Sequence, residues 1–129
     1  MLKKHKILVV EDDLSLRNAL VDKFSREGFS VIEAKNGEEG LEVALQKHPD
    51  LILLDIVMPK MDGITMLKKL REDTWGKGVK VIILSNLNDN QKVAEALEQG
   101  SFEYLVKTDW KIEDIVAKVK DNIKKQFYS

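Results

Sequence analysis

Residues 51–55 form the run Leu51-Ile52-Leu53-Leu54-Asp55, in which four apolar side chains lead to a carboxylate. A short, continuous apolar run predicts a β-strand that is buried on both faces. A second run of this kind, residues 7–10, is followed by Glu11-Asp12-Asp13. In a parallel sheet both acidic ends would lie at the same edge. Carboxylates gathered in one crevice raise each other's pKa, so they need a divalent cation to stay ionised together.

Short aliphatic runs alternate with longer stretches of helical period along the whole chain. This alternation predicts five βα units and an α/β fold, a doubly wound, five-stranded parallel sheet with helices on both faces. The first, third and fourth strands are apolar enough to be buried on both faces, whereas the second and fifth are expected at the periphery. The predicted strands cover residues 6–10, 30–33, 51–54, 79–84 and 102–106.

The helical stretches carry apolar residues at spacings of three and four, which predicts one buried stripe on each helix. Gly28 and Gly100 are expected to end the first and fourth helices. Asn36 with Glu39 predicts the start of the second helix, and Asn88-Asp89 the start of the fourth. The side chains expected to face the core are Leu16, Leu20 and Phe24; Leu41, Ala44 and Leu45; Leu67 and Leu70; Val93, Ala94 and Leu97; and Ile112, Ile115, Val116, Val119 and Ile123.

The composition describes one ordinary globular domain. A length of 129 residues predicts a single domain over residues 1–129. The formal net charge of -1 gives no electrostatic case for binding nucleic acid. Cysteine is absent, which excludes disulfides and thiolate metal sites and fits a cytoplasmic location. The apolar run after residues 3–6 is too short for a signal peptide or a membrane span.

Ligands of an open parallel sheet bind beyond the carboxyl ends of its strands, so the residues after each strand are the functional candidates. They supply a magnesium site, a carboxylate nucleophile, a hydrogen-bond donor and a fixed positive charge. Phosphoryl transfer to a carboxylate needs these parts, because its transition state spreads negative charge beside an anionic nucleophile. The candidates are Glu11-Asp12-Asp13, Asp55, Ser85-Asn86 and Lys107-Thr108.

Four motifs in this order resemble the receiver domain of two-component response regulators across essentially the whole chain. They are Val9-Val10-Glu11-Asp12, the segment from Asp55 to Gly63, Ser85 and Lys107, with 30 positions from Asp55 to Ser85 and 22 from Ser85 to Lys107. The resemblance implies a flavodoxin-like sheet with the strand order 2-1-3-4-5. It also implies a CheY-like single-domain regulator or an isolated receiver.

The resemblance implies how phosphoryl transfer would proceed at this edge. Asp55 would be the phosphoacceptor, and Lys107 would neutralise charge on the phosphoryl oxygens. The implied cofactor is Mg²⁺ or Mn²⁺. Its ligands would be Asp12, the carboxylate of Asp55, the backbone carbonyl of Val57 and, mostly through water, Glu11.

The implied switch uses Ser85 and Tyr104. Phosphorylated Asp55 would draw Ser85 inward, and Tyr104 would rotate into the vacated space and re-form the face made by the fourth helix, fifth strand and fifth helix. The phosphodonor would be a histidine kinase or a phosphotransfer protein. The changed face would bind a downstream protein target or a second copy of the chain. We expect no direct nucleic-acid or membrane partner, and no turnover of an external metabolite beyond self-phosphorylation and self-dephosphorylation.

Several positions depart from the common pattern of the family. Thr108 stands where most receivers have proline, so we expect a trans peptide bond after Lys107 and a slightly displaced lysine. Asn86 stands where a small residue is usual, and would either crowd the phosphoryl pocket or offer it a donor. Val57 and Leu87 are apolar at the mouth of the site, and we expect them to hinder water and lengthen the phosphorylated lifetime.

Other interpretations compete with this one. A hydrolase with an aspartyl-phosphate intermediate would want an acid two positions after the nucleophile, where Val57 stands. A flavin-binding protein should present hydroxyl and glycine loops at this edge, not acids. A pseudo-receiver that only binds proteins is kept open by Thr108 and Asn86. Asp13 has a simpler interpretation as a helix N-cap, and Tyr104 as core packing.

Overall fold

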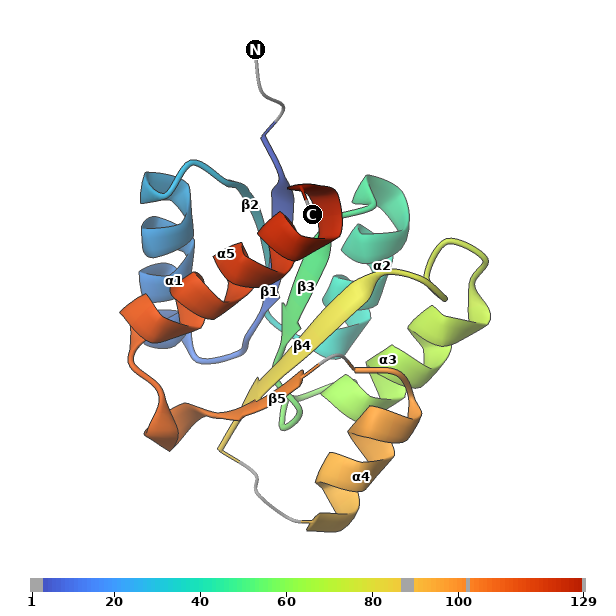
Figure 1. Ribbon diagram of the computed structural model, residues 1–129. Helices are drawn as coiled ribbons and strands as arrows, with labels where there is room; N and C mark the ends of the chain where they lie inside the picture. Colours follow the sequence, from blue (N-terminus) through green and yellow to red (C-terminus); the bar gives the residue numbers. More distant parts are fainter. Residues whose placement is uncertain (1–3, 87–89, 102, 129) are drawn as a thin grey trace.

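The structure, a computed structural model, describes residues 4–86, 90–101 and 103–128. Five parallel strands lie within these residues and form one sheet in the order β2-β1-β3-β4-β5, which confirms the predicted topology (Figure 1). The strands are β1 (Lys6–Val10), β2 (Ser30–Ala34), β3 (Leu51–Leu54), β4 (Lys80–Ser85) and β5 (Glu103–Val106).

Burial along the strands follows their place in the sheet. β1, β3 and β4 are buried over nearly their whole length, whereas the edge strands β2 and β5 are mostly half-buried, as the sequence predicts. Because all five strands point the same way, their carboxyl ends meet at one edge, in the lower half of Figure 1. The polar residues that follow the strands are therefore brought together there.

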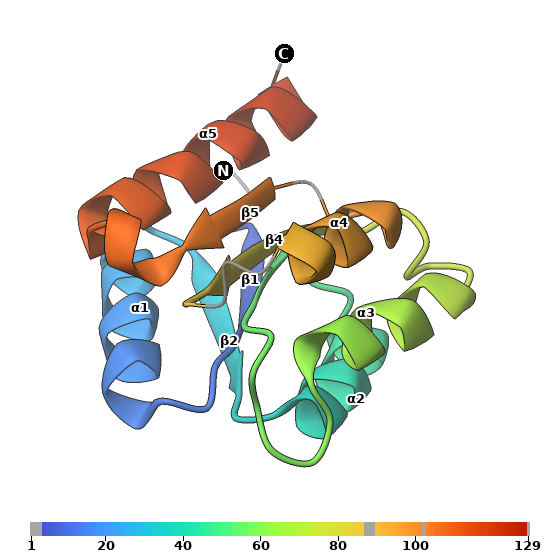
Figure 2. The ribbon, with the colours of Figure 1, turned by 90° about the horizontal axis from the view of Figure 1, so that it is seen from below.

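Helices cover both faces of the sheet (Figure 2). One face carries α1 (Leu14–Arg26) and α5 (Ile112–Tyr128), and the other carries α2 (Gly37–Lys47), α3 (Gly63–Glu72) and α4 (Asn90–Glu98). A short 3-10 helix, η1 (Lys107–Asp109), connects β5 to α5. Among the described residues, none of the helices is both long enough and apolar enough to traverse a bilayer.

Each face of the sheet has its own apolar core, because successive side chains of a strand point to opposite faces. Ile7 and Val9 of β1 belong to the core beneath α1 and α5, together with Phe24. Leu8 and Val10 belong to the core beneath α2, α3 and α4. β1 is thus buried between two separate sets of helices, which fixes the position of its carboxyl end.

The start of each of three helices is fixed by a side-chain cap. Asp13 accepts a hydrogen bond from the Leu16 N–H at 3.2 Å, which confirms its predicted role at the start of α1. Asn36 caps α2 and Asp62 caps α3 in the same way. Gly28, with a φ of 95°, follows α1 in the left-handed region that glycine adopts without strain.

Some predicted details were wrong. Val79 lies before β4, which begins at Lys80. Leu45 is 38% exposed, and Leu97 of α4 is 51% exposed; Ala94 is exposed as well, and Ala96 is buried in their place. α4 packs against the edge strand β5 and against α3, so only a narrow side of the helix is covered. Phe102 and the predicted helix start Asn88-Asp89 lie outside the described residues.

Candidate functional site

The carboxyl ends of the strands surround a cleft of about 460 Å³. β1 leads into the acidic group, β3 into Asp55, and β5 into Lys107, while Ser85 is the last residue of β4. The structure therefore brings together the residues that the sequence placed at this edge. The cleft is lined by Glu11, Asp12, Asp13, Asp55, Val57, Ser85, Asn86 and Lys107.

Asp55 is only 5% exposed, and both of its carboxylate oxygens are engaged. Its Oδ1 accepts a hydrogen bond from the Ile56 N–H at 2.7 Å, and its Oδ2 lies 3.2 Å from Nζ of Lys107. The Asp55 N–H donates to the Val10 carbonyl at 3.0 Å, which continues the β1–β3 ladder by one residue. The backbone of Asp55 is thereby held by the sheet itself.

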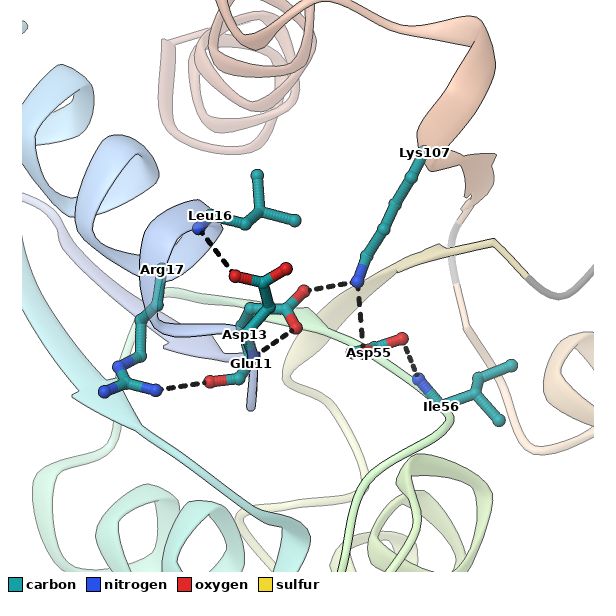
Figure 3. Close-up of polar contacts among 7 residues, drawn as sticks. All are labelled: Glu11, Asp13, Leu16, Arg17, Asp55, Ile56 and Lys107. Atoms are coloured by element: carbon teal, nitrogen blue, oxygen red, sulfur yellow. Dashed lines mark hydrogen bonds and ion pairs between the residues drawn. The ribbon is translucent and has the colours of Figure 1, made fainter.

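Glu11 is buried beside Asp55, with an exposed fraction of 2%. Its Oε1 lies 2.7 Å from Nζ of Lys107, and its Oε2 accepts a hydrogen bond from the Asp13 N–H at 3.0 Å. Figure 3 shows Lys107 reaching across the cleft to both carboxylates. One ammonium group thus bridges the two buried acids that follow the central strands.

Burial controls the protonation of Glu11. It raises the pKa of the Glu11 carboxyl to about 7, and the negative charge of Asp55 raises it further. Hydrogen bonds from Lys107 and the Asp13 N–H act in the opposite direction. Burial lowers the pKa of Lys107, but the two carboxylates outweigh burial and raise it above its usual value. Without a further cation, ionisation of both buried carboxylates is therefore energetically unfavourable.

Three carboxylates are placed to hold a metal ion. One oxygen from each of Glu11, Asp12 and Asp55 lies within 4.8 Å of the others. Oxygen ligands of this kind suit Mg²⁺ and Mn²⁺. Asp12 is exposed, whereas the other two are buried, so an ion there would be open to water on one side. The raised pKa of Glu11 fits this interpretation, because a divalent cation would favour its ionised form.

The loop after Asp55 is packed tightly against the sheet edge. The Gly63 N–H donates to the Ile56 carbonyl at 2.8 Å, and the Gly37 N–H donates to the Met61 carbonyl at 3.0 Å. A Cβ atom on Gly63 would lie 2.1 Å from the Asp55 carbonyl oxygen, so only glycine fits there. This close approach anchors the start of α3 directly behind Asp55.

The two proposed switch residues lie in different surroundings. Ser85 is 1% exposed and lines the cleft. Tyr104 is half-buried and packs against the core beneath α2, α3 and α4; it is not one of the described residues that line the cleft. Core packing of Tyr104 is therefore observed, and its switch role stays a prediction.

The departures from the family pattern leave the cleft assembled. The described peptide bonds are trans, including the one before Thr108, and Lys107 still reaches Glu11 and Asp55. Asn86 is exposed at the rim, and the Val57 side chain is 62% exposed. Leu87 lies outside the described residues.

Sequence reasoning missed the contribution of Arg17. Its Nη1 donates to the Glu11 carbonyl at 2.8 Å (Figure 3). Its Nε donates to Glu33 of β2 at 2.9 Å, so Arg17 links the backbone of the acidic group to β2. An arginine six positions after Glu11 in an amphipathic helix has no distinctive signal. Two histidines make ring contacts away from the cleft: His5 stacks on Phe127, and His48 stacks on Trp75.

Comparison with known proteins agrees with this geometry. A family model for the response regulator receiver domain matches residues 7–120. The probable transcriptional regulator ycf27 of Porphyridium aerugineum is 39% identical over 106 residues, which make up 82% of this chain and 43% of that protein. This chain therefore spans less than half the length of the first curated relatives it matches.

Solved structures show the same fold. A CheY-like receiver domain protein from Methanospirillum hungatei has a TM-score of 0.89 and 26% identity, with 96% of this chain and 97% of that chain covered. The CheX-CheY-BeF3-Mg²⁺ complex from Borrelia burgdorferi has a TM-score of 0.80 and 33% identity, with 97% and 90% covered. The fold, the cleft and the family match together show that this chain belongs to the response regulator receiver domain family.

Proposed function

We propose that this chain is a phosphorelay response regulator that accepts a phosphoryl group on Asp55 from a histidine kinase or a phosphotransfer protein. The observation that carries the proposal is the buried Asp55 carboxylate, 3.2 Å from Lys107 and grouped with Glu11 and Asp12. A structural ion pair needs one acid for one lysine. Here three acids share one lysine at the rim of an open cleft, which suits an incoming anion only when a cation accompanies it.

In the proposed reaction, an oxygen of Asp55 attacks the phosphorus of a phosphohistidine. The new P–O bond forms as the P–N bond breaks, and the electron pair returns to the imidazole nitrogen, which takes up a proton. Lys107 moves its ion pair from the carboxylate to a phosphoryl oxygen, and Ser85 donates a hydrogen bond to another. Both groups already line the cleft, so little rearrangement is required.

Mg²⁺ or Mn²⁺ is the proposed cofactor, and it would neutralise charge shared by the carboxylates and the phosphoryl oxygens. Asp12, Asp55 and the Val57 carbonyl would hold it directly, and Glu11 mostly through water. The oxygen donors and the open side of the cleft support this ligand set.

The proposed output is a change in the face formed by α4, β5 and α5. Ser85 ends β4, and Tyr104 lies on the neighbouring strand β5, where Ser85 pairs with Val106. Movement of Ser85 toward a phosphoryl group would therefore shift β5 and, with it, α4. The changed face would bind a downstream protein, or a second copy of the chain as a homodimer.

The remaining parts of the proposal follow from the receiver fold. We propose a single receiver domain over residues 1–129, a cytoplasmic location, and self-catalysed phosphorylation and dephosphorylation without turnover of an external metabolite. A pseudo-receiver is the alternative, but no described feature of the cleft favours it, because Asp55, Ser85 and Lys107 are all in place.

Hydrogen exchange tests the proposal. The chain is treated with acetyl phosphate and Mg²⁺, and exchange is compared with a sample in EDTA and with Asp55→Asn. We expect changed protection in α4 and β5 for the phosphorylated wild type alone. Unchanged protection despite phosphorylation would refute the switch, and absence of phosphorylation would favour the pseudo-receiver.

A further inference from the structure

A second pocket, of about 430 Å³, lies at the opposite edge of the sheet, beside the amino end of β4. Its lining residues come from the end of α3, the α3–β4 loop and the start of β4, from the turn after α4 and from the last turn of α5. Its polar lining comes from Arg71, Lys77, Lys80, Ser101 and Gln126. Among the described residues that line it, three are cationic and none is a carboxylate, although the chain carries a net charge of -1.

Arg71 brings a positive charge into this pocket without an acidic partner. Its guanidinium donates to four backbone carbonyls, those of Gly76, Val79, Gln99 and Gly100, at 2.6 to 3.0 Å. Burial lowers the pKa of Arg71, and no carboxylate pairs with it in the described part of the chain. Carbonyl dipoles satisfy its N–H groups but leave its net charge uncompensated, which is costly for a half-buried cation.

Other groups of the pocket also have unused hydrogen-bonding capacity. Ser101 is 8% exposed, and its Oγ is the one buried side-chain polar atom without a hydrogen-bond partner among the described residues. Within the same part of the chain, the Lys77 ammonium forms no ion pair and the Gln126 amide no hydrogen bond. A buried hydroxyl without a partner is rare enough to need an explanation.

We propose that this pocket binds the phosphate group of a small anion. A phosphate presents several strong acceptor oxygens and a double negative charge, which match the Lys77 ammonium, the Ser101 hydroxyl and the nearby charge of the Arg71 guanidinium. The volume lies within the range of small-molecule sites. The site is at the far edge from Asp55, so the proposal does not depend on the phosphorelay.

The adjoining pocket suggests what the phosphate could be attached to. It shares Gly78, Val79 and Gln126 with the first pocket and continues to the stacked pair of His48 and Trp75, whose rings are 4.2 Å apart. A ligand with a planar ring could extend along this groove. Free phosphate and a nucleotide are therefore the two sources to distinguish.

The test is an NMR titration of the ¹⁵N-labelled chain in EDTA. The probes are inorganic phosphate, pyrophosphate and AMP, each compared with sodium chloride at the same ionic strength. We expect saturable shifts of the Gly78, Gly100 and Ser101 amide signals. Tighter binding of AMP than of phosphate would identify a nucleotide-type ligand, and equal binding would identify phosphate alone; either supports the site. Shifts that do not saturate, or that match those in chloride, would overturn it.

Variants separate binding from structure. Lys77→Gln should weaken phosphate binding roughly fivefold, because it removes one nearby charge. Ser101→Ala should also weaken binding, yet leave the unfolding temperature of the free protein unchanged or higher, because it deletes a hydroxyl that has no partner. Lys92→Gln is the control, since Lys92 pairs with Glu95 on α4 and does not line the pocket. Equal affinities in Lys77→Gln, Ser101→Ala and Lys92→Gln would refute the site.

Discussion

Glu11 should make the metal-free protein lose stability as the pH rises. The pKa of this carboxyl is about 7 in the folded protein and about 4.5 in an unfolded chain. Between these values the folded state holds a proton that the unfolded state has released, so the free energy of unfolding falls with increasing pH. The whole interval corresponds to about 3 kcal/mol, at about 1.4 kcal/mol for each pH unit.

Urea unfolding in EDTA measures this effect. Between pH 5 and pH 8 we expect the wild type to lose about 2 to 3 kcal/mol relative to Glu11→Gln, because most of the interval between the two pKa values lies in this range. Groups that titrate in both proteins cancel in the comparison. Parallel pH profiles for the two proteins, within about 0.5 kcal/mol, would show that ionising Glu11 costs nothing and would refute the electrostatic account of the cleft.

The same linkage sets the pH dependence of metal binding. An ion at the carboxylates needs Glu11 ionised, so the proton must leave when the ion binds. We expect the affinity for Mg²⁺ to rise roughly tenfold for each pH unit below 7 and to level off above it, as measured by calorimetry. Glu11→Gln should remove most of this dependence.

Three further substitutions, together with one control variant, test other contacts in and beside the cleft. Lys107→Met should lower the free energy of unfolding by about 3 kcal/mol at pH 8 in EDTA, as measured by urea unfolding, because it leaves Glu11 and Asp55 without their cation. Excess Mg²⁺ should recover part of the loss. Equal stability of the variant and the wild type would contradict the ion-pair bridge. Gly63→Ala should cost about 3 kcal/mol, whereas Gly78→Ala, whose Cβ meets nothing within 4 Å, should not destabilise; equal effects would contradict the close approach. Asp13→Ala should cost about 1 kcal/mol through the lost cap and leave Mg²⁺ affinity unchanged, and a tenfold loss of affinity would instead identify a metal ligand.

The fold was predictable because its strongest signals are long and regular. The apolar runs of β1, β3 and β4 stand out, since strands buried on both faces carry no polar alternation. The exposure of Leu97 was not predictable, because a helical stripe indicates a buried side but not how much of it a sheet edge can cover.

The candidate site was predictable for a different reason. Residues that directly follow parallel strands converge on one edge, so Glu11, Asp55 and Lys107 could be placed together before any distance was known. Long-range side-chain contacts follow no such rule. Arg71 donates hydrogen bonds to backbone carbonyls of residues 5 to 29 positions away, and nothing in its local sequence indicates these contacts.

Mass spectrometry of the intact chain after acetyl phosphate treatment tests the central claim, that Asp55 becomes an acyl phosphate with the help of a divalent ion. We predict the addition of one phosphoryl group in Mg²⁺, none in EDTA, and none in Asp55→Asn. Addition to Asp55→Asn at the wild-type level, or no addition to the wild type in Mg²⁺, would contradict the account.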